Sequence, residues 1–98
     1  MYTATVVFDL KLPEVSRSLK AKRSYVRPLI AALRKLDVSV AEVGFLDRYG
    51  RTEIGVAVVS AELRHAHEVL DNCERTVFAR PEYEVLSVRR RIYSEHDD

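Results

Sequence analysis

Residues 3–12 read Thr-Ala-Thr-Val-Val-Phe-Asp-Leu-Lys-Leu, and the fold of the chain can be worked out from this stretch. Every second side chain from Ala4 to Leu12 is apolar, whereas the positions between them are mostly polar. A period of two residues is typical of a β-strand that is buried on one face. Pro13, which lacks a backbone N–H, marks the end of this strand. The apolar face of the strand requires a second layer to cover it.

Two segments with helical periodicity can supply that layer. Ser18 is a suitable N-cap for a helix that runs to about Leu36, and a second helix is expected over residues 62–79, before Pro81. Apolar residues recur in both at the three- and four-residue spacing of a helix face. The side chains expected to face the core are Leu19, Val26, Leu29, Ile30, Leu33 and Leu36 in the first helix and Leu63, Ala66, Leu70, Cys73 and Val77 in the second.

Three further strands complete the pattern. Residues 38–46 and 52–60 are rich in Val and Ile, and Gly50 in the loop between them is expected to adopt a left-handed conformation. Residues 83–93 alternate again. The side chains expected on the core side of this last strand are Leu86, Val88 and Ile92. The proline and glycine residues are expected only at the joints between elements.

The resulting order, βαββαβ, restricts the topology. Right-handed crossover connections place both helices on the same face of the sheet. The economical arrangement is an α+β, ferredoxin-like sandwich, in which an antiparallel four-stranded sheet has the strand order 4-1-3-2 and two helices cover one face.

Length and composition narrow the class of protein. A chain of 98 residues with 47% apolar and 32% charged residues is expected to form one globular domain, over residues 1–94, with a short acidic tail at 95–98. The single cysteine excludes an internal disulfide and a cysteine-rich zinc site. Because no apolar run can span a bilayer and the first ten residues do not resemble a signal peptide, we expect a cytoplasmic protein with no membrane partner.

Charge is distributed unevenly along a chain whose net charge is only +1. Residues 11–35 contain eight Lys or Arg and one acidic residue, Glu14, whereas residues 36–87 contain five basic and ten acidic residues. The basic segment covers the first predicted helix and the loop before it. At about 100° per residue, four of its cations lie within about 60° of one another, beside the apolar stripe: Lys20, Arg23, Arg27 and Arg34.

Several of these cations lie where a helix disfavours them. The N-terminus is the positive end of the helix dipole, and its first N–H groups have no intrahelical partner. A cation there is unfavourable by about 0.3–1 kcal/mol, whereas an anion would contact N–H groups and cations together. We therefore expect an anion-binding surface; the alternative is a solvated basic face, shielded by the acidic tail. The predicted site residues are Arg17, Ser18, Lys20, Lys22, Arg23, Arg27 and Arg34.

The sheet face without helices is expected to be more apolar than the surface of a monomer. Its expected small or apolar side chains are Val7, Val43, Ala57, Val59, Val85 and Tyr93. An exposed face of an antiparallel sheet is ordinarily polar, so these residues indicate a homodimer that pairs through this face. The alternative is ordinary apolar surface, which is common in monomers.

The sequence gives little support to a metal site, a glycine-rich phosphate loop, a serine nucleophile or a cofactor. His65 and His67 diverge by about 200° on a helix, so they cannot share a metal ion. No glycine-rich phosphate loop is present, Ser24 and Ser60 have no evident base partner, and no cofactor is implied. We therefore expect a protein that is not an enzyme.

Two known classes share the βαββαβ order. The RNA-recognition module stacks bases on aromatic side chains of its first and third strands. The exposed positions of the third predicted strand, none of them aromatic, are Glu53, Gly55, Ala57 and Val59. Acylphosphatases bind phosphate beside an Arg in the loop where Arg17 lies, but they also use an Asn, and Asn72 falls on the second predicted helix. A small-phosphate enzyme remains the second alternative.

A family resemblance can be read from three blocks of sequence. Residues 17–23 (RSLKAKR), 38–43 (VSVAEV) and 54–60 (IGVAVVS) closely resemble the YlxP-like family, a bacterial family of unknown function, and the ending LSVRRR at 86–91 looks like its actinobacterial branch. The resemblance covers essentially the whole chain and implies a ferredoxin-like fold. It carries over no catalytic residues.

The genomic setting of that family implies a role near the ribosome or RNA, because its genes often lie beside those for translation initiation factor 2 and ribosome-binding factor A. We therefore expect binding of RNA or a ribonucleoprotein particle through the basic first helix. The first alternative is an adaptor whose basic helix docks on the acidic surface of a partner protein.

Overall fold

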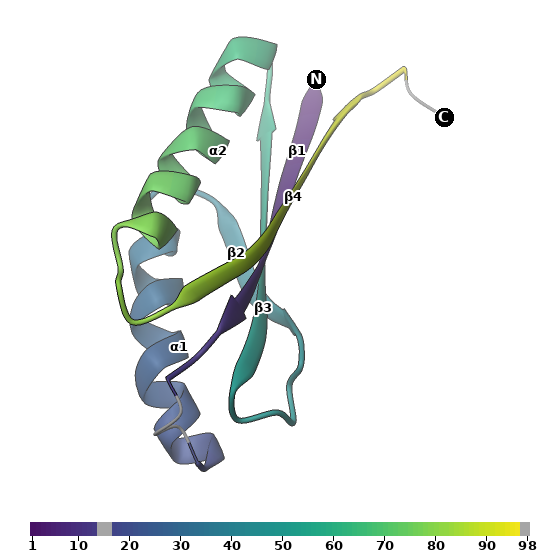
Figure 1. Ribbon diagram of the computed structural model, residues 1–98. Helices are drawn as coiled ribbons and strands as arrows, with labels where there is room; N and C mark the ends of the chain where they lie inside the picture. The colour runs from purple at the N-terminus through teal and green to yellow at the C-terminus, as the bar shows by residue number, and fades with distance from the viewer. Residues whose placement is uncertain (14–16, 97–98) are drawn as a thin grey trace.

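The computed structural model describes residues 1–13 and 17–96. It contains the six expected elements in the expected order (Figure 1). They are β1 (Tyr2–Lys11), α1 (Leu19–Arg34), β2 (Ser39–Gly44), β3 (Arg51–Ser60), α2 (Leu63–Phe78) and β4 (Glu84–Ser94). Neither helix of the described residues is long and apolar enough to cross a membrane.

The four strands form one antiparallel sheet with the order β2-β3-β1-β4, which is the predicted order 4-1-3-2 read from the other edge. Both helices lie on the same side of the sheet, and the opposite face carries no helix (Figure 1). The α+β, ferredoxin-like fold is therefore confirmed. Its central strands, β1 and β3, pair along ten residues, from Tyr2 opposite Ser60 to Lys11 opposite Arg51.

The core lies between the sheet and the two helices, as the alternation in the first strand predicts. The buried side chains of β1 and the residue after it are Ala4, Val6, Phe8, Leu10 and Leu12. Those of the helices include Val26, Leu29 and Leu33 in α1 and Ala66, Val69, Leu70, Cys73 and Val77 in α2. Leu19 and Leu63, which were expected in the core, are exposed, since each is the first residue of its helix and lies at the margin of the packed layer.

A β-bulge in β4 corrects the predicted orientation of that strand. Asp9 pairs with Ser87 but Leu10 pairs with Val85, so that Leu86 is left without a partner on β1. One extra residue reverses which side chains face the core. Val85 therefore packs against the core rather than lying on the helix-free face, and Leu86, which was expected on the core side, is 43% exposed.

The hairpin between β2 and β3 also differs from its prediction. Gly50 does not adopt a positive φ; that conformation occurs at Phe45, with a φ of 56°, at the start of the loop, and at Asp37, with a φ of 59°, after α1. Asp tolerates the left-handed region, whereas a bulky aromatic residue is strained there. Contacts from other elements must therefore hold Phe45 in place.

Pro28 lies inside α1 rather than at a joint, and the helix continues past it. A proline at this position removes one backbone donor, so the carbonyl group of Ser24 loses its usual helical partner. Both residues line the outer surface of the helix, where water can replace the missing hydrogen bond. Exposure therefore makes the proline tolerable.

The bulge in β4 can be tested with three alanine variants. Leu10→Ala removes a fully buried side chain and should lower the free energy of unfolding by about 2–5 kcal/mol. Leu86→Ala should lower it by less than about 1 kcal/mol, because the side chain is exposed. Val85→Ala should lower the free energy of unfolding more than Leu86→Ala does, although it removes fewer carbon atoms. Urea denaturation measures all three, and the reverse order for residues 85 and 86 would contradict the bulge.

Candidate functional site

The N-terminus of α1 is capped as predicted. Ser18 has an extended backbone, with φ −154° and ψ 162°, and its Oγ accepts a hydrogen bond of 3.0 Å from the backbone N–H of Ala21. Its carbonyl oxygen accepts from the N–H of Lys22 at 2.9 Å. The first turn contains no acidic residue. This helix end therefore combines the positive end of the dipole with basic side chains, as the charge pattern indicated.

Three predicted cations meet on the outer surface of α1. Lys20, Arg23 and Arg27 line an open groove of about 550 Å³ together with Ser24 and Pro28. All three cations are exposed, and none forms an ion pair or hydrogen bond with another residue of the described ranges. Glu14, the acidic residue of the basic segment, lies outside the described residues. The groove is thus lined by cations that the described part of the molecule does not neutralise.

The two remaining arginines of the predicted site extend this surface. Arg17 is exposed just before the helix, and Arg34 is exposed in its last turn. At about 1.5 Å per residue, Lys20 and Arg34 are separated by roughly 21 Å along the helix axis. We use the name α1 basic surface for Arg17, Lys20, Arg23, Arg27 and Arg34, with Ser18 as the cap at its start.

Lys22 does not belong to this surface, which corrects its prediction as a contact to an anion. Its side chain is only 4% exposed, and its Nζ lies 2.9 Å from the Glu42 carboxylate and 2.6 Å from the Phe45 carbonyl oxygen. The hydroxyl of Thr52, fully buried, donates to the same Glu42 oxygen at 2.6 Å. We call Lys22, Glu42, Thr52 and the Phe45 carbonyl the buried polar cluster. It ties α1 to β2, to the hairpin and to β3.

The buried polar cluster also explains the strained residue of the hairpin. The carbonyl oxygen of Phe45 accepts hydrogen bonds from Lys22 Nζ and from the N–H of Arg48, at 2.6 Å and 3.0 Å. The guanidinium of Arg51 lies 4.4 Å from the centroid of the Phe45 ring, in a cation–π contact. Contacts on both its backbone and its ring therefore hold Phe45 in the left-handed conformation.

The helical periodicity of the sequence already places Lys22 on the apolar face of α1. At about 100° per residue, Lys22 lies about 200° from Lys20, close to the centre of the apolar stripe near 220°. A lysine there must either extend to solvent or find a buried partner. Glu42 lies opposite Ile54, a core residue of β3, and so supplies that partner. The pairing joins residues far apart in the chain, so the sequence alone did not indicate it.

Two arginines of β4 form ion pairs with carboxylates. Arg89 contacts Glu53 at 2.9 Å, and Arg90 contacts Asp71 at 2.7 Å and Glu74 at 2.9 Å. The hydrogen bond from Arg90 holds the pKa of the Asp71 carboxyl below its usual value. The run of three arginines in β4 is thus divided between the two faces of the sheet and is partly neutralised, unlike the α1 basic surface.

The part of the acidic tail that the structure describes does not cover α1. Glu95 accepts a hydrogen bond of 2.9 Å from the N-terminal ammonium group of Met1, and its N–H donates to the Met1 carbonyl. This end of the chain lies at the other end of the molecule from the N-terminus of α1 (Figure 1). Asp97 and Asp98 lie outside the described residues.

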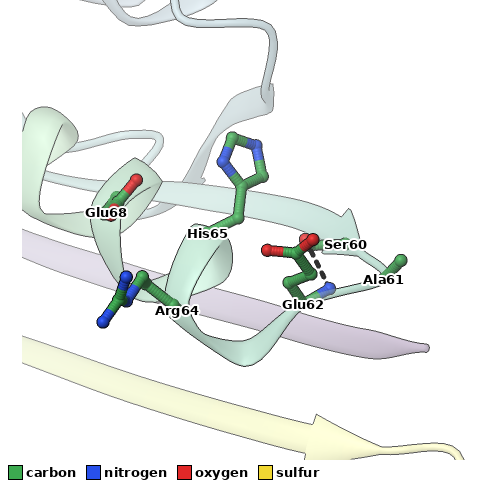
Figure 2. A pocket seen from close by; sticks show the side chains of 6 residues that line it. All are labelled: Ser60, Ala61, Glu62, Arg64, His65 and Glu68. Carbon is green, nitrogen blue, oxygen red and sulfur yellow. Dashed lines mark hydrogen bonds between the residues drawn. The ribbon is translucent and has the colours of Figure 1, made fainter.

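A second hollow, of about 300 Å³, lies at the start of α2. Figure 2 shows that its histidine and charged side chains spread away from one another instead of converging, with His65 pointing away from Arg64. The backbone N–H of Glu62 donates to Ser60 Oγ at 3.1 Å, which ends β3 and starts the helix. Two carboxylates, those of Glu62 and Glu68, lie here beside one cation, Arg64, so this hollow does not favour an anion.

Two further residues whose side chains could take part in chemistry, Cys73 and Asn72, have structural roles. Cys73 is buried in the core face of α2, where desolvation raises the pKa of its thiol and disfavours the reactive thiolate. Asn72, the residue weighed against an acylphosphatase site, lies on α2, and its amide oxygen accepts a hydrogen bond from Arg75. It does not line the groove of Lys20, Arg23 and Arg27.

Fold and surface together define a small ferredoxin-like sandwich with a basic helix on its outer side. The chain belongs to the family described as "Protein of unknown function (DUF503)", whose model matches residues 3–90. It is similar to the uncharacterized protein YlxP of Bacillus subtilis (strain 168), with 31% identity over 68 residues, which cover 68% of this chain and 74% of that protein. The expected YlxP-like resemblance is thereby confirmed.

Two solved structures align with the chain. The de novo designed protein Foldit4 aligns with a TM-score of 0.65 at 14% identity, over 98% of this chain and 100% of the designed protein. A putative antibiotic biosynthesis monooxygenase from Bacillus cereus aligns with a TM-score of 0.45 at 18% identity, over 99% of this chain and 94% of that protein. At these identities, the match to the designed protein concerns the fold alone.

The structural role of Lys22 can be separated from the proposed role of the exposed cations. Lys22→Met leaves the Glu42 carboxylate and the Phe45 carbonyl without the ammonium group, and it should lower the free energy of unfolding by about 2–4 kcal/mol. The control, Lys20→Met, alters an exposed side chain and should change it by about 0.5 kcal/mol or less. Equal effects in urea denaturation would contradict the buried polar cluster.

Proposed function

We propose that this protein binds RNA, alone or within a ribonucleoprotein particle, through the α1 basic surface. The observation that carries the proposal is the groove between Lys20, Arg23 and Arg27, whose cations have no carboxylate partner among the described residues. Like charges three and four residues apart on a helix repel one another. An anion bound in this groove would attract all three cations and so offset that repulsion.

Phosphate groups are the anions that suit this arrangement. Arginine guanidinium groups form paired hydrogen bonds with phosphate oxygens, and the positive end of the α1 dipole adds attraction for an anion at the start of the helix. The surface extends roughly 21 Å along the helix, which favours several phosphates along a backbone over one small metabolite. Contacts of this kind position a nucleic acid and carry little sequence information.

The resemblance to the YlxP-like family supports RNA as the polyanion. Genes of that family often lie beside genes of translation factors, which is compatible with a partner at the ribosome. The same basic surface would also attract an acidic protein, and the adaptor alternative differs only in its partner. Crosslinking in cell lysate with and without ribonuclease distinguishes them, since a direct protein partner survives removal of RNA.

The proposal predicts a specific loss of binding. The triple variant Lys20→Ala, Arg23→Ala and Arg27→Ala should reduce the affinity for a fluorescent single-stranded RNA to background in fluorescence anisotropy, because it removes the cations of the groove. The matched control removes three cations on or next to the other helix, Arg64, Arg75 and Arg80, and should bind as the wild type does. Equal losses in both variants would show that only net charge matters.

Salt provides the second part of the same test. The logarithm of the affinity of the wild type should fall linearly with the logarithm of salt concentration, with a slope of about −0.7 for each phosphate contact on a single strand. The triple variant should show a shallower slope or no measurable binding. Two results would refute the proposal. One is an affinity of the wild type that does not depend on salt, and the other is a folded triple variant that binds RNA as tightly as the wild type does.

A further inference from the structure

The helix-free face of the sheet carries an apolar strip that the fold itself leaves uncovered. On β3, Val59 is 61% exposed and projects from the same face as Ala57 and Gly55. On β2, Val43 is also exposed, and a Cβ at Gly55 would lie only 3.0 Å from a Val43 methyl group, so the valine leans over the glycine. The strip therefore crosses from one strand to the next.

The shape of this strip is uneven. A shallow hollow of about 440 Å³ lies over the small residues at its centre, next to the projecting side chain of Val59. The residues that line the hollow are Thr5, Val7, Ser39, Ala41, Val43, Gly55, Val56 and Ala57. Val59 lies two and four positions from Ala57 and Gly55 along β3, on the same face. A projection and a hollow thus lie side by side on one surface.

Four charged side chains next to the strip form ion pairs within the molecule. The guanidinium of Arg51 binds both oxygens of Asp9, at 2.8 Å and 2.9 Å, and Arg89 binds Glu53 at 2.9 Å. Both pairs lie on the helix-free side: Asp9 and Arg51 are on the neighbouring strands β1 and β3, whereas Arg89 on β4 reaches across β1 to Glu53 on β3. Because these four charges are paired within one copy, they add little repulsion between two identical faces. Arg91, opposite Thr5 on the same side, has no carboxylate partner among the described residues, and its guanidinium donates to the Tyr93 hydroxyl at 3.1 Å.

We propose that a second copy of this chain covers the helix-free face, in a symmetric dimer in which Val59 of each copy enters the hollow of the other. Two-fold contacts are reciprocal, so one surface must carry both the projection and its hollow, as this one does. Because Ala57 lies midway between Gly55 and Val59, the two-fold axis passes close to Ala57.

The size of the face is near the lower end of the range for such a dimer. Three strands of ten or eleven residues and one of six, at roughly 3.3 Å per residue and about 4.8 Å apart, give a face of roughly 590 Å². This is of the same order as the roughly 800 Å² that each partner contributes to a stable interface. The helices, and with them the two α1 basic surfaces, would lie on the two outer sides of the dimer.

Sedimentation equilibrium of the wild type and two variants, without RNA, tests the proposal independently of the proposed function. The wild type should have twice the mass of the 11.2 kDa chain and should dissociate on dilution. Val59→Glu should weaken the dimer by about 100-fold, because it buries two carboxylates of like charge. The matched control, Phe78→Glu, changes an apolar side chain of similar exposure, 59%, at the end of α2, and should leave the mass unchanged.

Three outcomes would overturn the proposal. They are a monomeric wild type at all concentrations, a Val59→Glu variant that dimerises as the wild type does, and a Phe78→Glu variant that dissociates equally. Circular dichroism verifies that each variant is folded.

A crosslinking experiment covers the case in which Val59→Glu does not fold. In a background with Cys73→Ala, the variant Ala57→Cys should form a covalent dimer rapidly on mild oxidation, since the axis brings the two cysteines together. Phe78→Cys in the same background should react much more slowly. A rate for Ala57→Cys no faster than for Phe78→Cys would also refute this geometry.

Discussion

The ammonium group of Lys22 joins α1 to β2 and to the hairpin, and through the Glu42 carboxylate it is linked to β3. It lies in the apolar stripe of α1, bonds to the carboxylate of β2 and to the carbonyl of a strained hairpin residue, and is linked through that carboxylate to the hydroxyl of β3. A buried charge requires such partners, because desolvation without them would be very unfavourable. The cluster thereby fixes the position of α1 on the edge of the sheet, and with it the direction in which the exposed cations of the helix project.

The distribution of ion pairs divides the surface into parts with different properties. On both faces of the sheet, Arg51 of β3 and Arg89 and Arg90 of β4 bind carboxylates of other strands or of α2, so their charge is neutralised within the molecule. On the outer side of α1, Lys20, Arg23 and Arg27 have no such partner within the described ranges. A net charge of +1 therefore conceals one region that is strongly positive and another that is nearly neutral.

Sequence periodicity predicted the fold because both periods are strong and consistent with one another. Alternation placed β1 correctly from Ala4 to Leu12, and the βαββαβ order left one economical topology. The errors arose where a single residue changed the register or where partners are distant. The bulge at Leu86 reversed part of β4, and the burial of Lys22 depends on Glu42, twenty positions away. The strained conformation of Phe45 likewise depends on contacts from α1 and β3, which no local pattern records.

Both outer strands of the sheet are interrupted, since the register shifts once in β4 at Leu86 and once in β2 between Glu42 and Gly44. A long, regular edge strand offers a ladder of unpaired backbone groups on which another chain can add, and growth of this kind leads to fibrous aggregates. Here β2 has only six residues, and β4 carries three consecutive arginines. Irregular, short or charged margins discourage strand addition at either side. The two edge strands are thus poor templates for strand addition, which protects a concentrated solution of this small protein from edge-to-edge assembly.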